Sequence, residues 1–175
     1  MTPTSTVAPF AGPQTVRVAL VGAPHAYGVV AVAPIEQGGV LFPVDGLTTN
    51  RPSRYSIQID DHLHIDLAPD TTLDEQLVRY PWRFLNHSCD PNAAFHERTF
   101  VTLRHIDTGE SVTYDYNTTE LDMAVPFDCR CGRDRCLGRI RGFAHLSFAE
   151  QTRLRPWLAG HLRRRLDSAL QFARA

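Results

Sequence analysis

Four cysteines constrain the fold of this chain more strongly than any other feature of its sequence. Three of them, Cys129, Cys131 and Cys136, form a compact Cys-x-Cys-x-x-x-x-Cys run, whereas Cys89 stands alone well before them. Four thiolates make a complete tetrahedral ligand set for zinc, and a closed all-cysteine shell leaves no coordination position open for catalysis. The pattern therefore predicts a structural zinc site that pins residues 129–140 against the loop around Cys89.

The alternatives to zinc are two disulfides or four unrelated free thiols. Residues 1–15 have neither a basic start nor a continuous apolar run, and no later segment approaches the roughly 18 apolar residues of a membrane helix. We therefore expect a cytoplasmic protein without membrane contact, and disulfides are disfavoured in that reducing compartment. This argument favours zinc and leaves free thiols as the remaining alternative.

Short β-branched runs separated by glycine and proline dominate the rest of the chain. They predict strands joined by tight turns, and the pair Asp60-Asp61 predicts a hairpin between two of them. Only residues 147–172 show the spacing of leucines that is typical of a helix, with Pro156 expected to start or break a turn. The sequence thus predicts a mainly β chain of the α+β class with one or two C-terminal helices. The expected strands cover residues 16–21, 28–32, 40–42, 55–59, 62–66, 100–104 and 111–114.

Charge is divided unevenly along a chain whose 175 residues fit a single domain. Residues 1–15, rich in proline and threonine, predict a flexible arm. Residues 1–128 contain 7 arginines and 16 acidic residues, whereas residues 129–175 contain 11 arginines and 3 acidic residues. An acidic body favours a cationic substrate by steering. The basic C-terminal segment leaves three contacts open, namely nucleic acid, an acidic partner or the acidic body itself.

Three segments occur in an order that carries more information than each alone. Residues 83–92 read Arg-Phe-Leu-Asn-His-Ser-Cys-Asp-Pro-Asn, residues 109–116 read Gly-Glu-Ser-Val-Thr-Tyr-Asp-Tyr, and residues 129–138 carry the cysteine run. Together they resemble the signatures of the SET family of protein methyltransferases, including its post-SET zinc segment. In that family the fourth zinc ligand comes from the first signature, which is where Cys89 stands.

This resemblance implies a fold and a division of the chain. The implied fold has several short twisted sheets, a knot-like crossing of the Asn-His-Ser-Cys and Asp-Tyr segments, and a C-terminal helix. The expected parts are the arm at 1–15, a SET domain at 16–124, a post-SET zinc segment at 125–142 and a C-terminal helical extension at 143–175.

The resemblance also implies S-adenosylmethionine as the cofactor. Asn86 and His87 match the pair that binds its amino-acid end and its adenine. Residues 26–28 stand where the family carries Gly-x-Gly, and alanine can replace the first glycine only if its backbone angles are ordinary. Arg83 is expected to support the loop, and Arg130 to flank the adenine. The expected cofactor-binding set is Ala26, Tyr27, Gly28, Arg83, Asn86, His87, Tyr116 and Arg130.

Three tyrosines are the implied catalytic residues. Tyr116 matches the essential hydroxyl of the family, and its role would be alignment and electrostatics. Tyr114 matches the position that limits the number of methyl groups added, and a tyrosine there predicts mono- or dimethylation. Tyr55 resembles a channel-lining tyrosine of some relatives, with an exposed strand aromatic as the equal alternative.

Three functions compete on this basis. The first is transfer of methyl from S-adenosylmethionine to the lysine side chain of a protein or peptide. The second keeps the cofactor and gives it a small-molecule amine or another metabolite as acceptor. The third is a non-catalytic module that binds cofactor or a partner. The sequence leaves the oligomeric state open.

Overall fold

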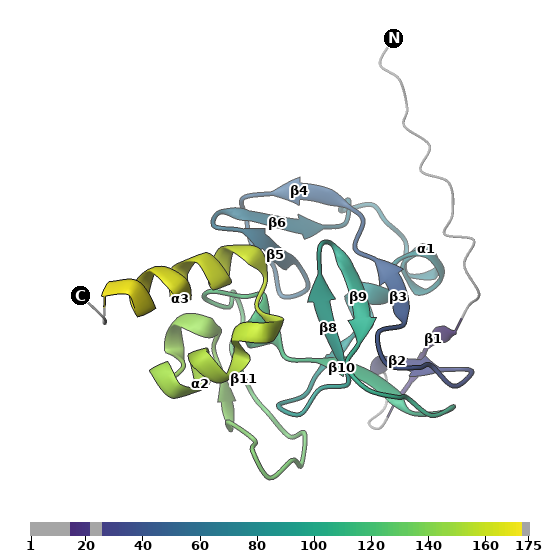
Figure 1. Cartoon of the computed structure of the whole chain (residues 1–175). Coiled ribbons are helices and arrows are strands. Elements are labelled where there is room, and N and C mark those ends of the chain that lie inside the picture. The colour runs from purple at the N-terminus through teal and green to yellow at the C-terminus, as the bar shows by residue number, and fades with distance from the viewer. Residues whose placement is uncertain (1–14, 22–25, 173–175) are drawn as a thin grey trace.

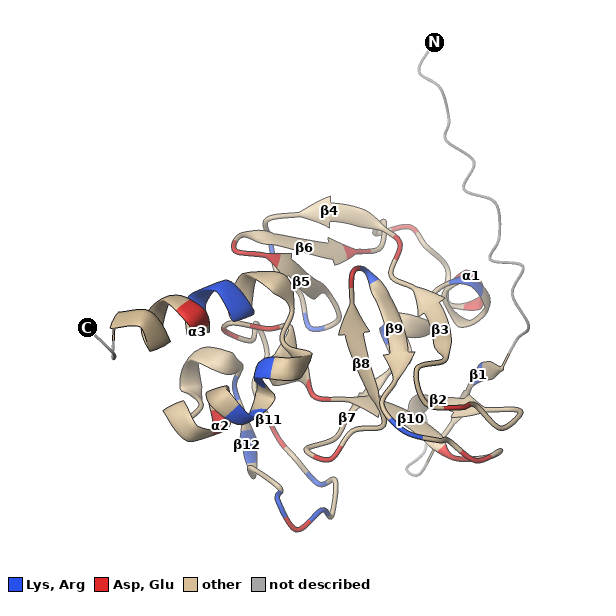
Figure 2. Cartoon of the chain, in the orientation of Figure 1, with Lys and Arg blue, Asp and Glu red and all other residues tan. Residues whose placement is uncertain are grey.

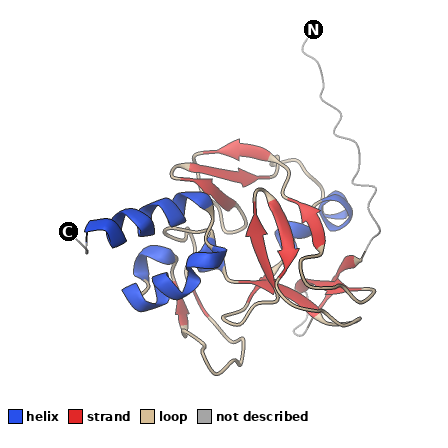
Figure 3. Cartoon of the chain, in the orientation of Figure 1, coloured by secondary structure: helices blue, strands red, loops and turns tan. Residues whose placement is uncertain are grey.

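Four small sheets, rather than one continuous sheet, build the body of the molecule (Figure 1). This computed structural model describes residues 15–21 and 26–172. The predicted N-terminal arm therefore lies almost entirely outside the described residues. Helices α2 and α3 gather at one side of the strands (Figure 3). The mainly β prediction is confirmed, since most of the expected strands form within one or two residues of their predicted ends.

The central sheet contains the crossing that the signatures predicted. Its strand order is β1-β2-β10-β7, and β1, β2 and β10 are antiparallel neighbours. The short strand β7 runs parallel to β10, with Asn86 opposite Thr113 and His87 opposite Tyr114. Two signatures far apart in the sequence therefore lie side by side. The bounds are β1 Val16–Leu20, β2 Tyr27–Ala31, β7 Asn86–His87 and β10 Ser111–Tyr114.

Two three-stranded sheets flank the central one. The first has the order β3-β9-β8, and the second has the order β4-β6-β5. β5 and β6 are antiparallel and are joined at Asp60 and Asp61, which confirms the predicted hairpin. The bounds are β3 Val40–Pro43, β8 Ala93–His96, β9 Thr99–Thr102, β4 Leu47–Thr49, β5 Ile57–Asp60 and β6 Leu63–Asp66.

One helix was absent from the sequence prediction. The α-helix α1 covers Leu73–Arg79 and leads into the 3-10 helix η1 at Pro81–Phe84. The hydroxyl of Thr72 accepts the backbone N–H of Glu75 and caps α1. The prediction of helix only in residues 147–172 was therefore wrong here, because α1 buries no residue and shows no apolar periodicity. The Thr-x-x-Glu pattern was its one local signal.

The C-terminal part packs around its own apolar cluster. Phe143, Leu154, Leu158, Leu162 and Leu166 form this second core, separate from the core among the sheets. The predicted break at proline is present, since a 3-10 turn separates α2 from α3. The bounds are η2 Tyr116–Thr118, β11 Phe127–Asp128, β12 Arg139–Ile140, η3 Phe143–His145, α2 Phe148–Leu154, η4 Arg155–Trp157 and α3 Gly160–Phe172.

Basic residues of α3 contact the acidic body (Figure 2). Arg164 pairs with Asp60 at 2.6 Å, and Arg165 pairs with Asp61 at 2.7 Å. Of the three contacts left open for the basic segment, the structure contains the internal one. Both pairs are exposed, so each contributes little to stability. Within the described part of the chain, none of the helices combines the length and apolarity that a bilayer crossing requires.

Candidate active site

The predicted cofactor loop meets the first signature through Asn86. The Asn86 amide donates to the carbonyl oxygen of Tyr27 at 3.1 Å. A Cβ at Gly28 would lie 2.9 Å from the Asn86 amide nitrogen and 2.5 Å from a Val21 methyl. Glycine is required because any side chain there would push apart the two segments. β2 and β7 thus bring Tyr27, Gly28 and Asn86 together.

Ala26 meets the condition set for an alanine at the first loop position. Its carbonyl oxygen accepts the Val21 N–H at 2.7 Å. Across residues 15–21 and 26–172, Glu97 and Arg98 are the only non-glycine residues with positive φ. The backbone of Ala26 is therefore ordinary, and the missing glycine causes no strain.

His87 joins three parts of the site. Its Nδ1 accepts the backbone N–H of Tyr116 at 3.2 Å, so the ring proton belongs on Nε2, which lies 3.3 Å from Sγ of Cys89. Burial lowers the pKa of His87 to about 4, so the ring is neutral at neutral pH. The ring also meets Phe127 edge-on, with 5.6 Å between centroids. His87 therefore connects the first signature, the Asp-Tyr segment and the cysteine cluster.

All four cysteines come together. Their sulfur atoms lie within 4.8 Å of one another, and the Sγ atoms of Cys89 and Cys129 are 3.9 Å apart. A disulfide needs about 2.05 Å, whereas Zn–S bonds of about 2.3 Å in a tetrahedron separate the sulfurs by about 3.8 Å. Burial raises the pKa of the Cys129 thiol to about 11, whereas hydrogen bonds outweigh burial at Cys131 and lower the pKa of its thiol to about 7. A bound cation would favour the thiolate form of Cys129. This donor set fits zinc and excludes the disulfide alternative in this conformation.

Tyr116 and Tyr114 form an enclosed aromatic pair. Their ring centroids are 4.7 Å apart, and the Tyr116 hydroxyl donates to the carbonyl oxygen of Leu85 at 2.6 Å. Burial raises the pKa of both hydroxyls, so both stay neutral. A fixed neutral hydroxyl beside a backbone carbonyl presents oxygen atoms that can form CH···O contacts.

A cavity opens beside this pair. Tyr114, Tyr116, Tyr55 and Glu120 all line it. Tyr55 is 51% exposed, so it stands at the mouth, whereas Glu120 is buried. Tyr55 therefore borders the cavity from an exposed bend before β5, and its role in a channel stays a prediction.

Arg83 lies at the acceptor cavity. Its guanidinium pairs with Asp66 and lies 4.8 Å from the centroid of the Tyr55 ring. It lines the same cavity, and its side chain forms no hydrogen bond to the cofactor loop within the described ranges. The partly buried carboxylate of Asp66 holds the guanidinium on the acceptor side, and a role of Arg83 toward the cofactor loop stays a prediction.

Two residues of the site were missed in the sequence, and one predicted residue makes little contact. Phe127 packs against both His87 and Tyr116, and its position two residues before Cys129 was a usable signal. Glu120 lies in a polar run whose pattern does not reveal its burial. Arg130 is exposed and forms no hydrogen bond or ion pair with the part of the chain that the structure describes.

Residues 26–117 match the SET domain family, which is more than half of the chain. The chain belongs to the SET-domain family. It is a SET-domain methyltransferase, so the SET-family recognition is confirmed, whereas the post-SET zinc segment stays a prediction. The matched range includes the Tyr27 loop, the Asn86–His87 strand and Tyr116, and ends before the cysteine run.

Relatives with curated names are also similar to this SET-domain chain. Methyltransferase flvH of Aspergillus flavus is 26% identical over 156 residues, which covers 86% of this chain and 80% of flvH. Histone-lysine N-methyltransferase ash1 of Drosophila melanogaster is 31% identical over 130 residues, which covers 66% of this chain and 6% of ash1. The chain therefore spans most of one relative and a small part of the other.

A solved structure supports the SET fold. The crystal structure of KRYPTONITE in complex with mCHH DNA, H3(1-15) peptide and SAH has a TM-score of 0.51 and 21% identity. The match covers 67% of this chain and 28% of that one. At this identity the likeness shows the fold of several small sheets, which the sequence had predicted.

Proposed function

We propose that this SET-domain methyltransferase uses S-adenosylmethionine to methylate a lysine side chain of a protein or peptide. The observation that carries the proposal is the position of Tyr116. Its backbone N–H binds His87 on the cofactor side, and its ring and hydroxyl line the acceptor cavity. One residue therefore connects the two halves of the site.

The cofactor half fits S-adenosylmethionine. Gly28 lets the Asn86 side chain approach the Tyr27 backbone closely, and the exposed amide of Asn86 retains hydrogen-bonding capacity for an amino-acid group. The half-buried ring of Phe127, which packs edge-on against the buried His87 ring, offers an aromatic surface suited to adenine. When bound there, the cofactor would supply a methyl group on a positively charged sulfur.

The chain itself contributes alignment and exclusion of water. The Tyr116 hydroxyl is held by the Leu85 carbonyl, so its oxygen has a fixed direction. Preorganised oxygens stabilise developing partial charge without reorganising during the reaction. The enclosed tyrosine pair keeps bulk water from the acceptor amine. None of these residues needs to form a covalent bond.

Two features support a lysine side chain as the acceptor. The cavity wall contains three tyrosines and the Glu120 carboxylate, which suit an alkyl chain that ends in an ammonium. Two arginines also line it, and one of them, Arg83, is paired with Asp66. The relative ash1 is named as a histone-lysine N-methyltransferase, and the KRYPTONITE structure contains an H3(1-15) peptide. We further propose mono- or dimethylation, because the Tyr114 hydroxyl takes up room beside the amine. Efficient trimethylation in a mass spectrum would contradict this.

We also propose that the four cysteines bind one structural zinc. The spacing of the four sulfur atoms, all within 4.8 Å of one another, supports it. The zinc would hold β11 and Phe127 against His87. We also propose a cytoplasmic location, because the four cysteines form no disulfide and a reducing compartment keeps cysteines in that state.

A small-molecule amine is the second candidate acceptor. The match to flvH covers most of both chains, and that relative is named only as a methyltransferase. A compact domain with a short insert between β4 and α1 offers little surface for selecting a protein. A non-catalytic module is the third class, and the enclosed tyrosine pair argues against it.

Labelled methyl transfer distinguishes the three. The purified protein is incubated with methyl-labelled S-adenosylmethionine and an extract of its own cells, and macromolecules are separated from small molecules. We expect label in protein, and none with Tyr116→Phe. Label confined to small molecules would support the second candidate, and label in neither fraction would contradict the proposed enzyme.

A further inference from the structure

Glu120 is a buried carboxylate in the wall of the acceptor cavity. It follows the 3-10 turn η2, four residues after Tyr116, and is only 6% exposed. No arginine pairs with it among the residues that the structure describes. A buried carboxylate without a basic partner is destabilising, so its presence in a reaction cavity calls for a chemical reason.

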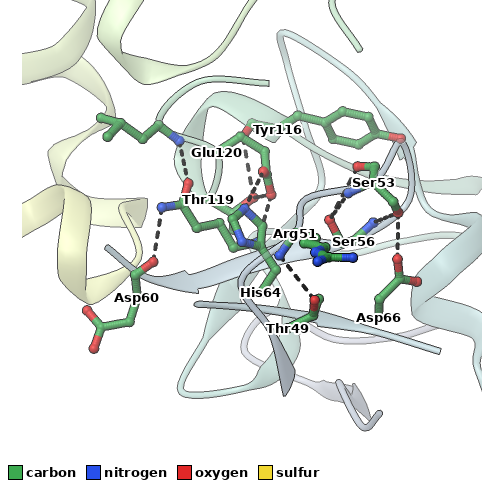
Figure 4. A network of polar contacts seen from close by, with 12 residues as sticks. Thr49, Arg51, Ser53, Ser56, Asp60, His64, Asp66, Tyr116, Thr119 and Glu120 are labelled. Atoms are coloured by element: carbon green, nitrogen blue, oxygen red, sulfur yellow. Dashed lines mark hydrogen bonds and ion pairs between the residues drawn. The ribbon is translucent and has the colours of Figure 1, made fainter. Parts of the chain in front are cut away.

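One oxygen of Glu120 has a structural role (Figure 4). Oε1 accepts the backbone N–H of Gln58 at 2.8 Å and the Thr119 hydroxyl at 3.3 Å. Gln58 completes the clamp, because its own side-chain oxygen accepts the Leu121 N–H at 2.8 Å. This clamp ties β5 to the segment that carries Tyr116.

The other oxygen of Glu120 has no such partner. Oε2 lies 3.7 Å from Nε2 of His64, which is too long for a hydrogen bond. Burial lowers the pKa of His64, so this ring is neutral and does not neutralise the carboxylate. Oε2 therefore keeps its capacity to accept a proton.

Titratable and charged side chains surround Glu120 from every packed element. Burial raises the pKa of Glu120 to about 7, which makes proton exchange near neutral pH feasible. Burial raises the pKa of both tyrosine hydroxyls, and the negative charge of Glu120 raises it in the same direction. The surrounding groups are His64 of β6, Tyr114 of β10, Tyr116 of η2, Arg54 and Tyr55 before β5, Arg83 of η1, and His161 of α3, which contacts the Thr119 carbonyl.

We propose that Glu120 is the proton acceptor for the substrate amine, a role that rests on the proposed function. A lysine ammonium has a pKa of about 10.4 and must lose a proton before its nitrogen can accept methyl. The N–H bond breaks, the proton passes to the Glu120 carboxylate, and the electron pair stays on nitrogen. After the methylated product leaves, the Glu120 carboxyl releases the proton to water.

The test compares pH–rate profiles of the unmodified protein and Glu120→Gln, with the acceptor found by the labelling experiment. The amide keeps an oxygen for the Gln58 N–H, so the clamp can persist. We expect kcat to fall by about 100-fold at pH 7. The loss should shrink toward about pH 10, where the amine is deprotonated in solution. Glu75→Gln, on the exposed face of α1, should match the unmodified protein throughout.

A second readout does not depend on activity. Infrared spectra should contain the carbonyl band of a protonated carboxyl that disappears around pH 7 and is missing in Glu120→Gln. Two results would overturn the role of Glu120 alone. One is methyl transfer whose pH–rate profiles are parallel in the unmodified protein and Glu120→Gln, and the other is a carboxyl band that is unchanged in Glu120→Gln. Absence of transfer by the unmodified protein would overturn the proposed function and this role with it.

Discussion

Tyr116 is held from two sides. Its backbone N–H binds His87 and its hydroxyl binds the Leu85 carbonyl, so neither the ring nor the oxygen can rotate freely. The neutral state of His87 matters here, because only an unprotonated Nδ1 can accept the Tyr116 N–H. The position of the catalytic hydroxyl therefore depends on a histidine of the other signature.

Removal of one oxygen tests this arrangement. Tyr116→Phe keeps the ring contacts and should lower kcat by at least about 100-fold, since oriented oxygens contribute on that scale. Loss of one hydrogen bond should lower the free energy of unfolding by only about 1 kcal/mol. Label transfer and denaturation measure the two effects. Tyr80→Phe, outside the cavity, should change neither, and an equal loss in both variants would contradict the assignment.

Glu120 should make stability fall as the pH rises. Its pKa is raised to about 7 from 4.5, so the folded state binds this proton more tightly than the unfolded state. Its contribution is most favourable below about pH 4.5, weakens between there and about pH 7, and stays constant above. The free energy of unfolding of Glu120→Gln should therefore be higher than that of the unmodified protein by up to about 3 kcal/mol at pH 8. At pH 5 the two proteins should differ little.

Denaturant titrations at the two pH values measure this difference. Burial also raises the pKa of Asp115, to about 6, so Asp115 likewise makes stability fall as the pH rises. Both proteins contain Asp115, so its contribution cancels in the difference between them. An equal stability difference at pH 5 and pH 8 would show that burial does not shift the pKa of Glu120.

Helix α3 stabilises the catalytic segment from behind. The Ala159 N–H, just before α3, donates to the Thr118 carbonyl at 2.9 Å, and the ring of His161 lies 3.0 Å from the Thr119 carbonyl. The helix is anchored by Leu162 and Leu166, which are almost fully buried in the second core. Packing of this extension therefore affects the segment between Tyr116 and Glu120.

A truncation in the second core should be costly. Leu162→Ala leaves a cavity and should lower the free energy of unfolding by about 3 kcal/mol. The matched control is Phe172→Ala on the same helix, where the ring is 84% exposed and the change should stay within about 0.5 kcal/mol. Equal effects in chemical denaturation would mean that α3 does not pack as described.

The elements that the sequence predicted share a physical property. β1, β2, β5, β6 and β10 carry β-branched alternation, and α3 carries a leucine stripe, so burial leaves a periodic signal. β7, β11 and β12 have two residues each, which is too short for any period. They exist because tertiary contacts hold them. The crossing of β7 with β10 was predicted from a resemblance, and no local pattern contains it.

The same limit applies to the site. Cys89, Asn86 and Tyr116 stand in signatures with a specific order, so they could be named in advance. Glu120 could not, because its importance comes from burial among β5, β6 and η2. The pairing of Arg83 with Asp66 could not be predicted either, since no local pattern places the two side chains together.

The cysteine cluster joins two parts of the molecule that are far apart in the sequence. Cys89 lies beside His87, and the other three cysteines belong to the segment that carries β11 and β12. A bound zinc would therefore connect the central sheet to Phe127. We expect one zinc per chain by elemental analysis, loss of it with a strong chelator, and a lower melting temperature afterwards. Cys89→Ser should reproduce both effects, whereas a metal-free protein of unchanged stability would contradict the site.

The central claim is that the crossing of β7 and β10 builds one cofactor site beside Tyr116. Calorimetric titration of the purified protein with S-adenosylmethionine tests it most directly. We predict one bound cofactor per chain, retained in Tyr116→Phe and lost in Gly28→Val, whose side chain would collide with Asn86 and Val21. No binding by the unmodified protein, or equal binding by Gly28→Val, would contradict the account.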